Sequence, residues 1–189
     1  NMYKSLVVTE MYDKKIKKSF NKLWSLETGE CIYTFEQSIV RFSSDGEYVA
    51  VVRQQDKEVD IYSVETSEIV NTINYDYNWL RNVKFSIDGS LLLLHSLDDE
   101  IEIWSLETNQ TIKKIVEPEE RKSFFSSEII IRSNKDYVVF MNDKGMVSYP
   151  ITNFDVKYFQ EVKYVLTDSP CRFSPDGNYL AFNNEIISV

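Results

Sequence analysis

A five-residue motif recurs along the sequence and limits the possible folds more than any other feature. The motif reads Phe-Ser-x-Asp-Gly and occurs at 42–46, 85–89 and 173–177, in steps of 43 and 88 residues. A degenerate copy at 132–136, midway along the longer step, has lost the phenylalanine and the glycine. Self-similarity at a fixed period of this length indicates stacked copies of one supersecondary unit.

A second motif has the same period but lies out of phase with the first. It reads Leu-Trp-Ser-Leu-Glu-Thr-Gly at 23–29 and matches Ile-Tyr-Ser-Val-Glu-Thr-Ser at 61–67 and Ile-Trp-Ser-Leu-Glu-Thr-Asn at 103–109. A weaker copy lies at 148–153. Because both motifs keep a constant order, each period is interpreted as one structural repeat.

The pattern within one period predicts four antiparallel strands and no helix. The Asp-Gly pair predicts a hairpin turn, because glycine accepts the positive φ of a tight turn. A strand that is apolar on both faces follows the turn, as expected between two packed sheets, and a strand with polar alternation comes next. A short fourth strand completes the period. An all-β chain with a four-stranded sheet every ~40–45 residues is typical of a β-propeller.

The two motifs resemble those of a known family. The Phe-Ser-x-Asp-Gly turn and the segment 23–29 are similar to the corresponding parts of WD40 repeats, and the resemblance covers nearly the whole chain. Family members commonly place aspartate after the aromatic residue, where this chain has Ser25, Ser63 and Ser105. The Gly-His pair before the first strand is missing, and the only histidine, His95, falls in a second strand. The resemblance therefore implies a divergent WD40-like β-propeller.

The register of the motifs predicts about four and a half blades. They comprise a partial blade over 5–36, complete blades over 39–74, 80–116 and 127–165, and a partial blade over 170–189. WD40 propellers usually have about seven blades, so we expect a segment of a larger propeller. A complete ring of four or five blades is the alternative. In an open stack, other blades or another chain are expected to cover the apolar sheet faces.

The charge and composition disfavour several classes of partner. The net charge of −9 disfavours direct contact with nucleic acid or an anionic membrane, because phosphate binding relies on clustered lysine and arginine. The nearest basic patch, Lys14, Lys15, Lys17 and Lys18, is explained by a solvated loop. Without a membrane-spanning window, a secretory signal pattern or paired cysteines, we expect a cytoplasmic protein.

The sequence contains no recognisable catalytic constellation. A serine–histidine–carboxylate triad would have to use His95, which sits in an apolar strand and is more simply a buried or rim-facing residue. Cys31 and Cys171 fall in different predicted blades and fit no metal or redox spacing. We therefore expect a protein that is not an enzyme and that has no catalytic residues, metal or cofactor.

The resemblance implies that partners bind the rim formed by the connections between blades. The connection at 74–79 is rich in aromatic residues, and tyrosine and tryptophan are enriched in binding hot spots. The next connection, at 117–125, switches from acidic to basic and carries further aromatics. Alternatively, the aromatic side chains form a satellite core beneath the loops, and Arg53 is merely solvated. The candidate partner-binding residues are Tyr75, Tyr77, Trp79, Arg53, Arg121 and Phe124.

The leading functional hypothesis is a non-catalytic scaffold or adaptor that binds proteins or peptides through one rim. A second hypothesis is the propeller of a translation or RNA-associated protein, similar to that of eukaryotic initiation factor 2A. A third is a gating propeller whose hydrolase domain lies outside this chain. Phe-Ser-Pro-Asp-Gly at 173–177 also resembles turns in propellers attached to serine peptidases, but the chain has no Gly-x-Ser-x-Gly elbow.

Overall fold

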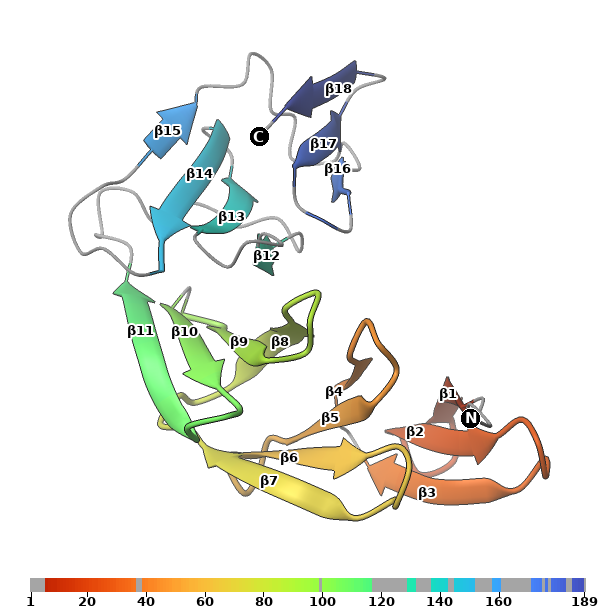
Figure 1. Cartoon of the computed structure of the whole chain (residues 1–189). Coiled ribbons are helices and arrows are strands. Elements are labelled where there is room, and N and C mark those ends of the chain that lie inside the picture. Colours follow the sequence, from red (N-terminus) through yellow and green to blue (C-terminus); the bar gives the residue numbers. More distant parts are fainter. Residues whose placement is uncertain are drawn as a thin grey trace.

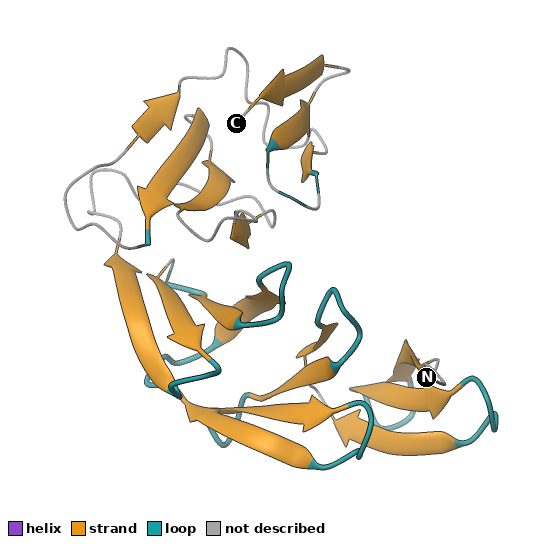
Figure 2. Ribbon diagram, in the orientation of Figure 1, coloured by secondary structure: helices purple, strands orange, loops and turns teal. Residues whose placement is uncertain are grey.

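The described part of the chain consists of antiparallel β-sheets and contains no helix. In the computed structural model these residues are 6–36, 39–98, 100–116, 129–131, 137–142, 145–151, 158–160, 171–174, 176, 178–182 and 185–188. Their strands form three sheets of four strands and two sheets of three, each built from consecutive strands (Figure 2). The predicted all-β class is confirmed, and the sheets are consistent with propeller blades.

The sheets follow one another in chain order around an arc that does not close in Figure 1. The first sheet holds β1 (Leu6–Asp13), β2 (Lys18–Ser25) and β3 (Cys31–Glu36). The second holds β4 (Ile39–Phe42), β5 (Tyr48–Arg53), β6 (Glu58–Ser63) and β7 (Ile69–Asn74). The third holds β8 (Leu80–Phe85), β9 (Leu91–Ser96), β10 (Glu100–Ser105) and β11 (Gln110–Val116).

Two further sheets complete the described arc. The fourth holds β12 (Ile129–Ile131), β13 (Tyr137–Asn142), β14 (Gly145–Pro150) and β15 (Tyr158–Gln160). The fifth holds β16 (Cys171–Phe173), β17 (Tyr179–Phe182) and β18 (Glu185–Ser188). The degenerate turn motif at 132–136 and the connection at 117–125 lie outside the described residues.

The first strand is longer than its sequence pattern predicts. An apolar pattern indicates a strand only as far as Thr9, whereas β1 continues to Asp13. The extension is explained by pairing, because β1 stays in register with β2 from Leu6↔Ser25 to Asp13↔Lys18. The lysines at 14, 15 and 17 consequently occupy the tip of a long hairpin.

The core lies between neighbouring sheets, and the strands β5 and β9 are buried on both faces. In β5, Val49 and Val51 pack toward the first sheet, whereas Ala50 and Val52 pack toward the third. In β9, the leucines at 91 and 93 pack toward the fourth sheet and those at 92 and 94 toward the second. Side chains alternate between the two faces of a strand, so a strand between two sheets needs apolar residues throughout.

The Phe-Ser-x-Asp-Gly motif forms the same serine–aspartate hydrogen bonds in its three intact copies. The Ser43 hydroxyl donates to Asp45 and accepts the backbone N–H of Tyr48 at 2.9 Å. Ser86 and Ser174 make the corresponding bonds to Asp88 and Asp176 and accept N–H groups at 2.9 Å. Gly46 and Gly89 have φ values of 75° and 70°, as the turn requires. The repeat is thus conserved in geometry as well as in sequence.

The Glu-Thr turns also share one geometry, in which Ser25, Ser63 and Ser105 have the same role. The Ser25, Ser63 and Ser105 hydroxyls each accept a backbone N–H from within their turn at 3.2–3.3 Å. The residue at the end of each turn has a positive φ, and these residues are Gly29, Ser67 and Asn109. A register shift recurs in the strand pair that each turn joins. Each serine therefore closes the turn that joins the last two strands of its sheet.

Replacing Ser43 by alanine is expected to destabilise the protein by about 1–2 kcal/mol, because the backbone N–H of Tyr48 loses its acceptor, the hydroxyl of the buried Ser43. Ser44→Ala, in the exposed part of the same turn, is the matched control and is expected to change stability by less than about 0.5 kcal/mol. The free energy of unfolding from urea denaturation measures both. Equal effects of the two substitutions would contradict this role of the hydroxyl.

His95 is buried in β9 with 1% of its surface exposed, and burial together with the charge of Arg81 lowers its pKa to about 4. Because its pKa in the unfolded chain is about 6.5, the unfolded state takes up a proton first as the pH falls. His95 is therefore expected to reduce stability by about 2 kcal/mol between pH 7.5 and pH 5. His95→Leu should lose that share of the pH dependence, measured by urea denaturation at both pH values. An unchanged slope would contradict the assignment.

Candidate partner-binding rim

The connection between β7 and β8 lies against the β5–β6 turn at one rim of the second and third sheets. The backbone N–H of Tyr75 donates to the carbonyl of Lys57 at 3.0 Å. The Gln54 amide donates to the Leu80 carbonyl at 2.6 Å and accepts the Leu80 N–H at 3.0 Å. These bonds fix the connection in place beside the turn.

The structure places Tyr75 and Tyr77 in the core, with 5% and 7% of their surfaces exposed. Their rings are stacked with centroids 6.2 Å apart. The Tyr75 hydroxyl donates to Gln54 at 3.0 Å, and the Tyr77 hydroxyl donates to Glu102 at 2.8 Å. Burial raises the pKa of Tyr75 to about 12, and burial with the Glu102 hydrogen bond raises that of Tyr77. Both residues therefore form the satellite core and offer a partner almost no surface.

Trp79 is the aromatic residue of this connection that is accessible, with 48% of its surface exposed. It borders a groove of about 300 Å³ that reaches from the end of β3 across the β5–β6 turn. Arg53 lies in the same groove, so the fold brings together two of the predicted residues. The predicted Arg121 and Phe124 lie outside the described residues. The groove is lined by Thr34, Phe35, Glu36, Arg53, Gln54, Gln55, Asp56 and Trp79.

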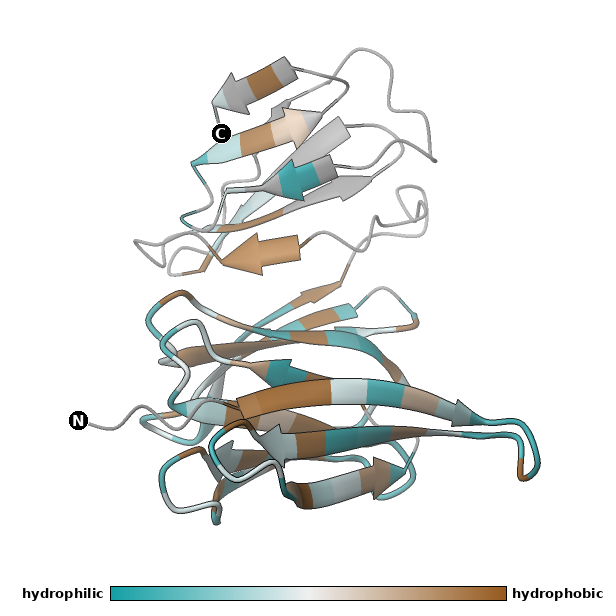
Figure 3. Ribbon diagram, turned by 90° about the vertical axis from the view of Figure 1, so that its right-hand side faces the viewer, coloured by the Kyte–Doolittle hydropathy of each residue, from teal (hydrophilic) through white to brown (hydrophobic). Residues whose placement is uncertain are grey.

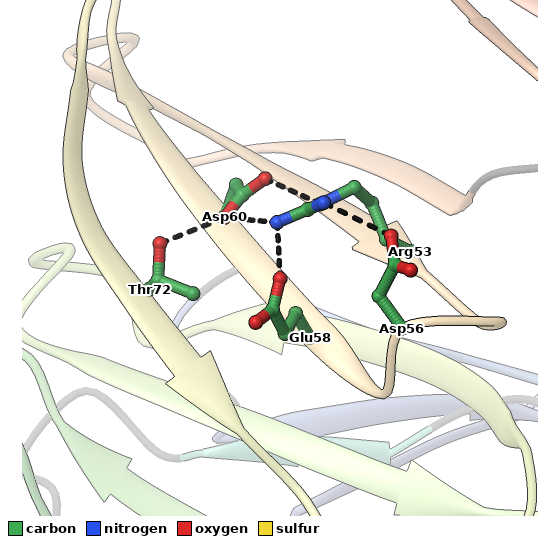
Figure 4. Close-up of polar contacts among 5 residues, drawn as sticks. All are labelled: Arg53, Asp56, Glu58, Asp60 and Thr72. Atoms are coloured by element: carbon green, nitrogen blue, oxygen red, sulfur yellow. Dashed lines mark hydrogen bonds and ion pairs between the residues drawn. The ribbon is translucent and has the colours of Figure 1, made fainter.

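Arg53 is held by three carboxylates, as Figure 4 shows. Its Nε lies 2.7 Å from Asp60 Oδ2, its Nη1 lies 2.9 Å from Asp56 Oδ2, and its Nη2 pairs with Glu58. Thr72 donates a hydrogen bond of 2.7 Å to Asp60, whose side chain is only 2% exposed. Desolvation opposes the charge of Arg53, but Asp60, Glu58 and Asp56 together raise its pKa.

The network gives Arg53 a structural role that the sequence analysis did not predict. Its side chain is 41% exposed, yet its donors already face three carboxylates. The acids at 56, 58 and 60 alternate along the turn and β6, and this alternation could have indicated the network. An anionic partner would have to displace an internal carboxylate, so Arg53 is better suited to form one wall of the groove.

A second buried carboxylate, also missed by the sequence analysis, lies at the equivalent position of the third sheet. Glu102 is 3% exposed and accepts hydrogen bonds from Tyr77 and Thr111. Lys114 Nζ lies 3.4 Å from its Oε2. Buried charges require such partners. Because Tyr77 comes from the connection that follows the second sheet, this cluster ties the rim to the third sheet.

The described residues hold no group of three or more histidine, cysteine or acidic side chains suited to a metal ion. In the same residues, no helix is long and apolar enough to cross a membrane. Cys31 is an exposed free thiol in β3, and Cys171 belongs to β16 of another sheet. No model of a known protein family matches the sequence. The rim presents the exposed side chain of Trp79 beside a groove.

Replacing Arg53 by methionine is expected to destabilise the protein by about 2 kcal/mol, because Asp60 keeps its buried charge without the cation. The partial exposure of Arg53 keeps the effect below that of a fully buried pair. Asp60→Asn added to Arg53→Met should restore about half of the loss. Urea denaturation of the four proteins of this double-mutant cycle measures the coupling. An Arg53→Met protein as stable as the wild type would contradict the structural role.

Proposed function

We propose that the sheets are blades of a divergent WD40-like propeller that acts as a non-catalytic protein-interaction scaffold. The recurring turn geometry, the sheets of up to four strands and their arrangement around an arc support this interpretation. Because the arc is open in Figure 1, we further propose that other blades or another chain complete it.

The exposure of Trp79 carries the proposal. A tryptophan that is half exposed at the mouth of a groove presents a large, rigid apolar surface, and such residues dominate the energy of protein interfaces. The backbone carbonyl of Trp79 accepts the N–H of Leu97 at 3.0 Å, and Leu97 is itself 50% exposed. A second exposed apolar side chain therefore belongs to the β9–β10 connection, whose backbone is bonded to that of Trp79.

The groove favours a protein or peptide over an anionic polymer. Glu36 and Asp56 both line it, and the charge of Arg53 is shared among three carboxylates. A phosphate backbone needs several accessible cations, which this lining does not supply. An apolar side chain of a protein partner fits better, packed against Trp79 and Phe35 with the exposed Gln55 at the edge.

Trp79→Ala is expected to weaken partner binding at this rim while leaving thermal stability nearly unchanged, because the side chain is half exposed. Affinity purification with the wild-type chain, read by mass spectrometry, identifies candidate partners. Titration of a purified partner with both proteins then measures an expected loss of affinity of at least tenfold, or about 1.4 kcal/mol.

Tyr179→Ala serves as the matched control, since Tyr179 is 52% exposed on the fifth sheet, away from the groove. The control protein is expected to bind every partner with wild-type affinity. A Trp79→Ala protein that keeps all partners would refute this rim as the binding site. A wild-type chain that retains none would argue against the scaffold function itself.

A further inference from the structure

A second groove, of about 400 Å³, opens between the second and third sheets at the opposite rim. It lies among the β4–β5, β8–β9 and β10–β11 turns, whereas Trp79 lies at the other end of these sheets. Its apolar surface comes from Tyr48, Val70 and Leu106. Tyr48 and Leu106 pack on the core cluster between the two sheets, and Val70 is 55% exposed. The groove therefore gives access to an apolar floor that continues into the core.

The lining of this groove is strongly acidic. It includes Asp45, Glu47, Asp88 and Glu107 and contains no lysine or arginine. The two aspartates brace their own turns through serine hydroxyls, but the carboxylates of the two exposed glutamates take no part in those bonds. A β-carbon on Gly89 would lie 2.8 Å from Asp45 Oδ2, so the turns of the two sheets approach closely. Charge complementarity therefore favours an occupant that carries cationic side chains beside an apolar one.

The chain itself contains a segment with this chemistry at the tip of the β1–β2 hairpin. The tip places Ile16, 54% exposed, among Lys14, Lys15, Lys17 and Lys18, and the lysines are exposed as well. Asp13 holds the tip by accepting the N–H of Lys15 at 2.8 Å. The hairpin strands have eight residues each, compared with six in β5 and β6. The hairpin accordingly extends beyond its neighbours in Figure 3.

The hairpin and the acidic groove lie at opposite rims of the molecule. Lys18, where β2 leaves the hairpin tip, pairs with Glu36, which lines the groove beside Trp79. The acidic groove lies at the far end of β5, beside the turn that begins at Ser43. When two copies stack in the same direction, the rim that carries the hairpin of one copy faces the rim that carries the acidic groove of the other. The hairpin of the first copy can then reach the acidic groove of the second.

We propose that this chain self-associates head to tail, with the β1–β2 hairpin tip of one copy inserted into the acidic groove of the next. Ile16 packs against Val70 and Leu106, and the lysines face Glu47 and Glu107. The contact is heterologous, so it propagates into rings or open stacks of copies. Because a hairpin tip buries little surface, the association is weak and depends on salt.

A charge swap tests the proposal. The groove variant is Glu47→Lys with Glu107→Lys, and the hairpin variant is Lys14→Glu with Lys15→Glu. The hairpin variant keeps two lysines unchanged: Lys17, which has a positive φ, and Lys18, which pairs with Glu36. The control variant is Glu27→Lys with Glu30→Lys, which changes the net charge equally on the same rim but outside the groove. Sedimentation velocity of the full chain over a range of concentrations, in about 50 mM and about 500 mM salt, reports association.

The wild type and the control are expected to associate at low salt, with association at least tenfold weaker at high salt. Each charge-swap variant alone is expected to associate at least tenfold more weakly than the wild type. An equimolar mixture of the two should restore association, because each basic site then meets an acidic one. Matching melting temperatures exclude unfolding as the cause of a loss.

Three results would overturn the proposal. A wild-type chain that is monomeric at every concentration shows that the groove does not bind a second copy. A control that loses association as strongly as the groove variant shows a general effect of net charge. A mixture that fails to associate shows that the two sites are not partners. The Trp79→Ala protein should associate like the wild type, so this outcome is independent of the proposed scaffold function.

Discussion

Neighbouring sheets are held together by the side chains of β5 and β9, which alternate between the sheet before and the sheet after. Leu92, Leu93 and Leu94 are completely buried, and a fully buried apolar side chain contributes about 1.5–3 kcal/mol. Since each such strand packs against two sheets, loss of one sheet exposes apolar surface on its neighbours. The rims, with their turns and connections, are positioned by this packing and have little freedom of their own.

Buried polar groups connect that packing to the rim that carries Trp79. Asp60 and Glu102 occupy the same position of successive sheets but have different partners, a guanidinium with Thr72 in one case and Tyr77 with a lysine in the other. An unpaired carboxylate at either position would be strongly unfavourable. The Tyr77 bond links the connection after the second sheet to a strand of the third. The aromatic connection therefore helps to hold the second and third sheets in register, and Trp79 projects from a fixed base.

The repeat and the strand patterns could be predicted from sequence because they depend on local chemistry. The serine, aspartate and glycine of each turn lie within five residues of one another, and alternation within a strand determines which side chains share a face. The burial of the rim aromatics could not be predicted in this way. Tyr75, Tyr77 and Trp79 share a spacing of two, but the chain bends at 77–78, so Trp79 departs from the direction of the tyrosines. Their hydrogen-bond acceptors, Gln54 and Glu102, lie 21 and 25 residues away in sequence.

Positions that are constant between repeats serve the fold, whereas positions that differ are available for binding. The serine and aspartate of the Phe-Ser-x-Asp-Gly motif are engaged within their own turns. The residue after the glycine differs between copies and reads Glu47, Ser90 and Asn178, so Glu47 adds to the acidic groove a negative charge that the other two copies of the motif lack. The connections between sheets differ even more, and only one presents a tryptophan. A fold built from equivalent sheets thus acquires distinct surfaces through substitutions that leave its turn geometry and its core unchanged.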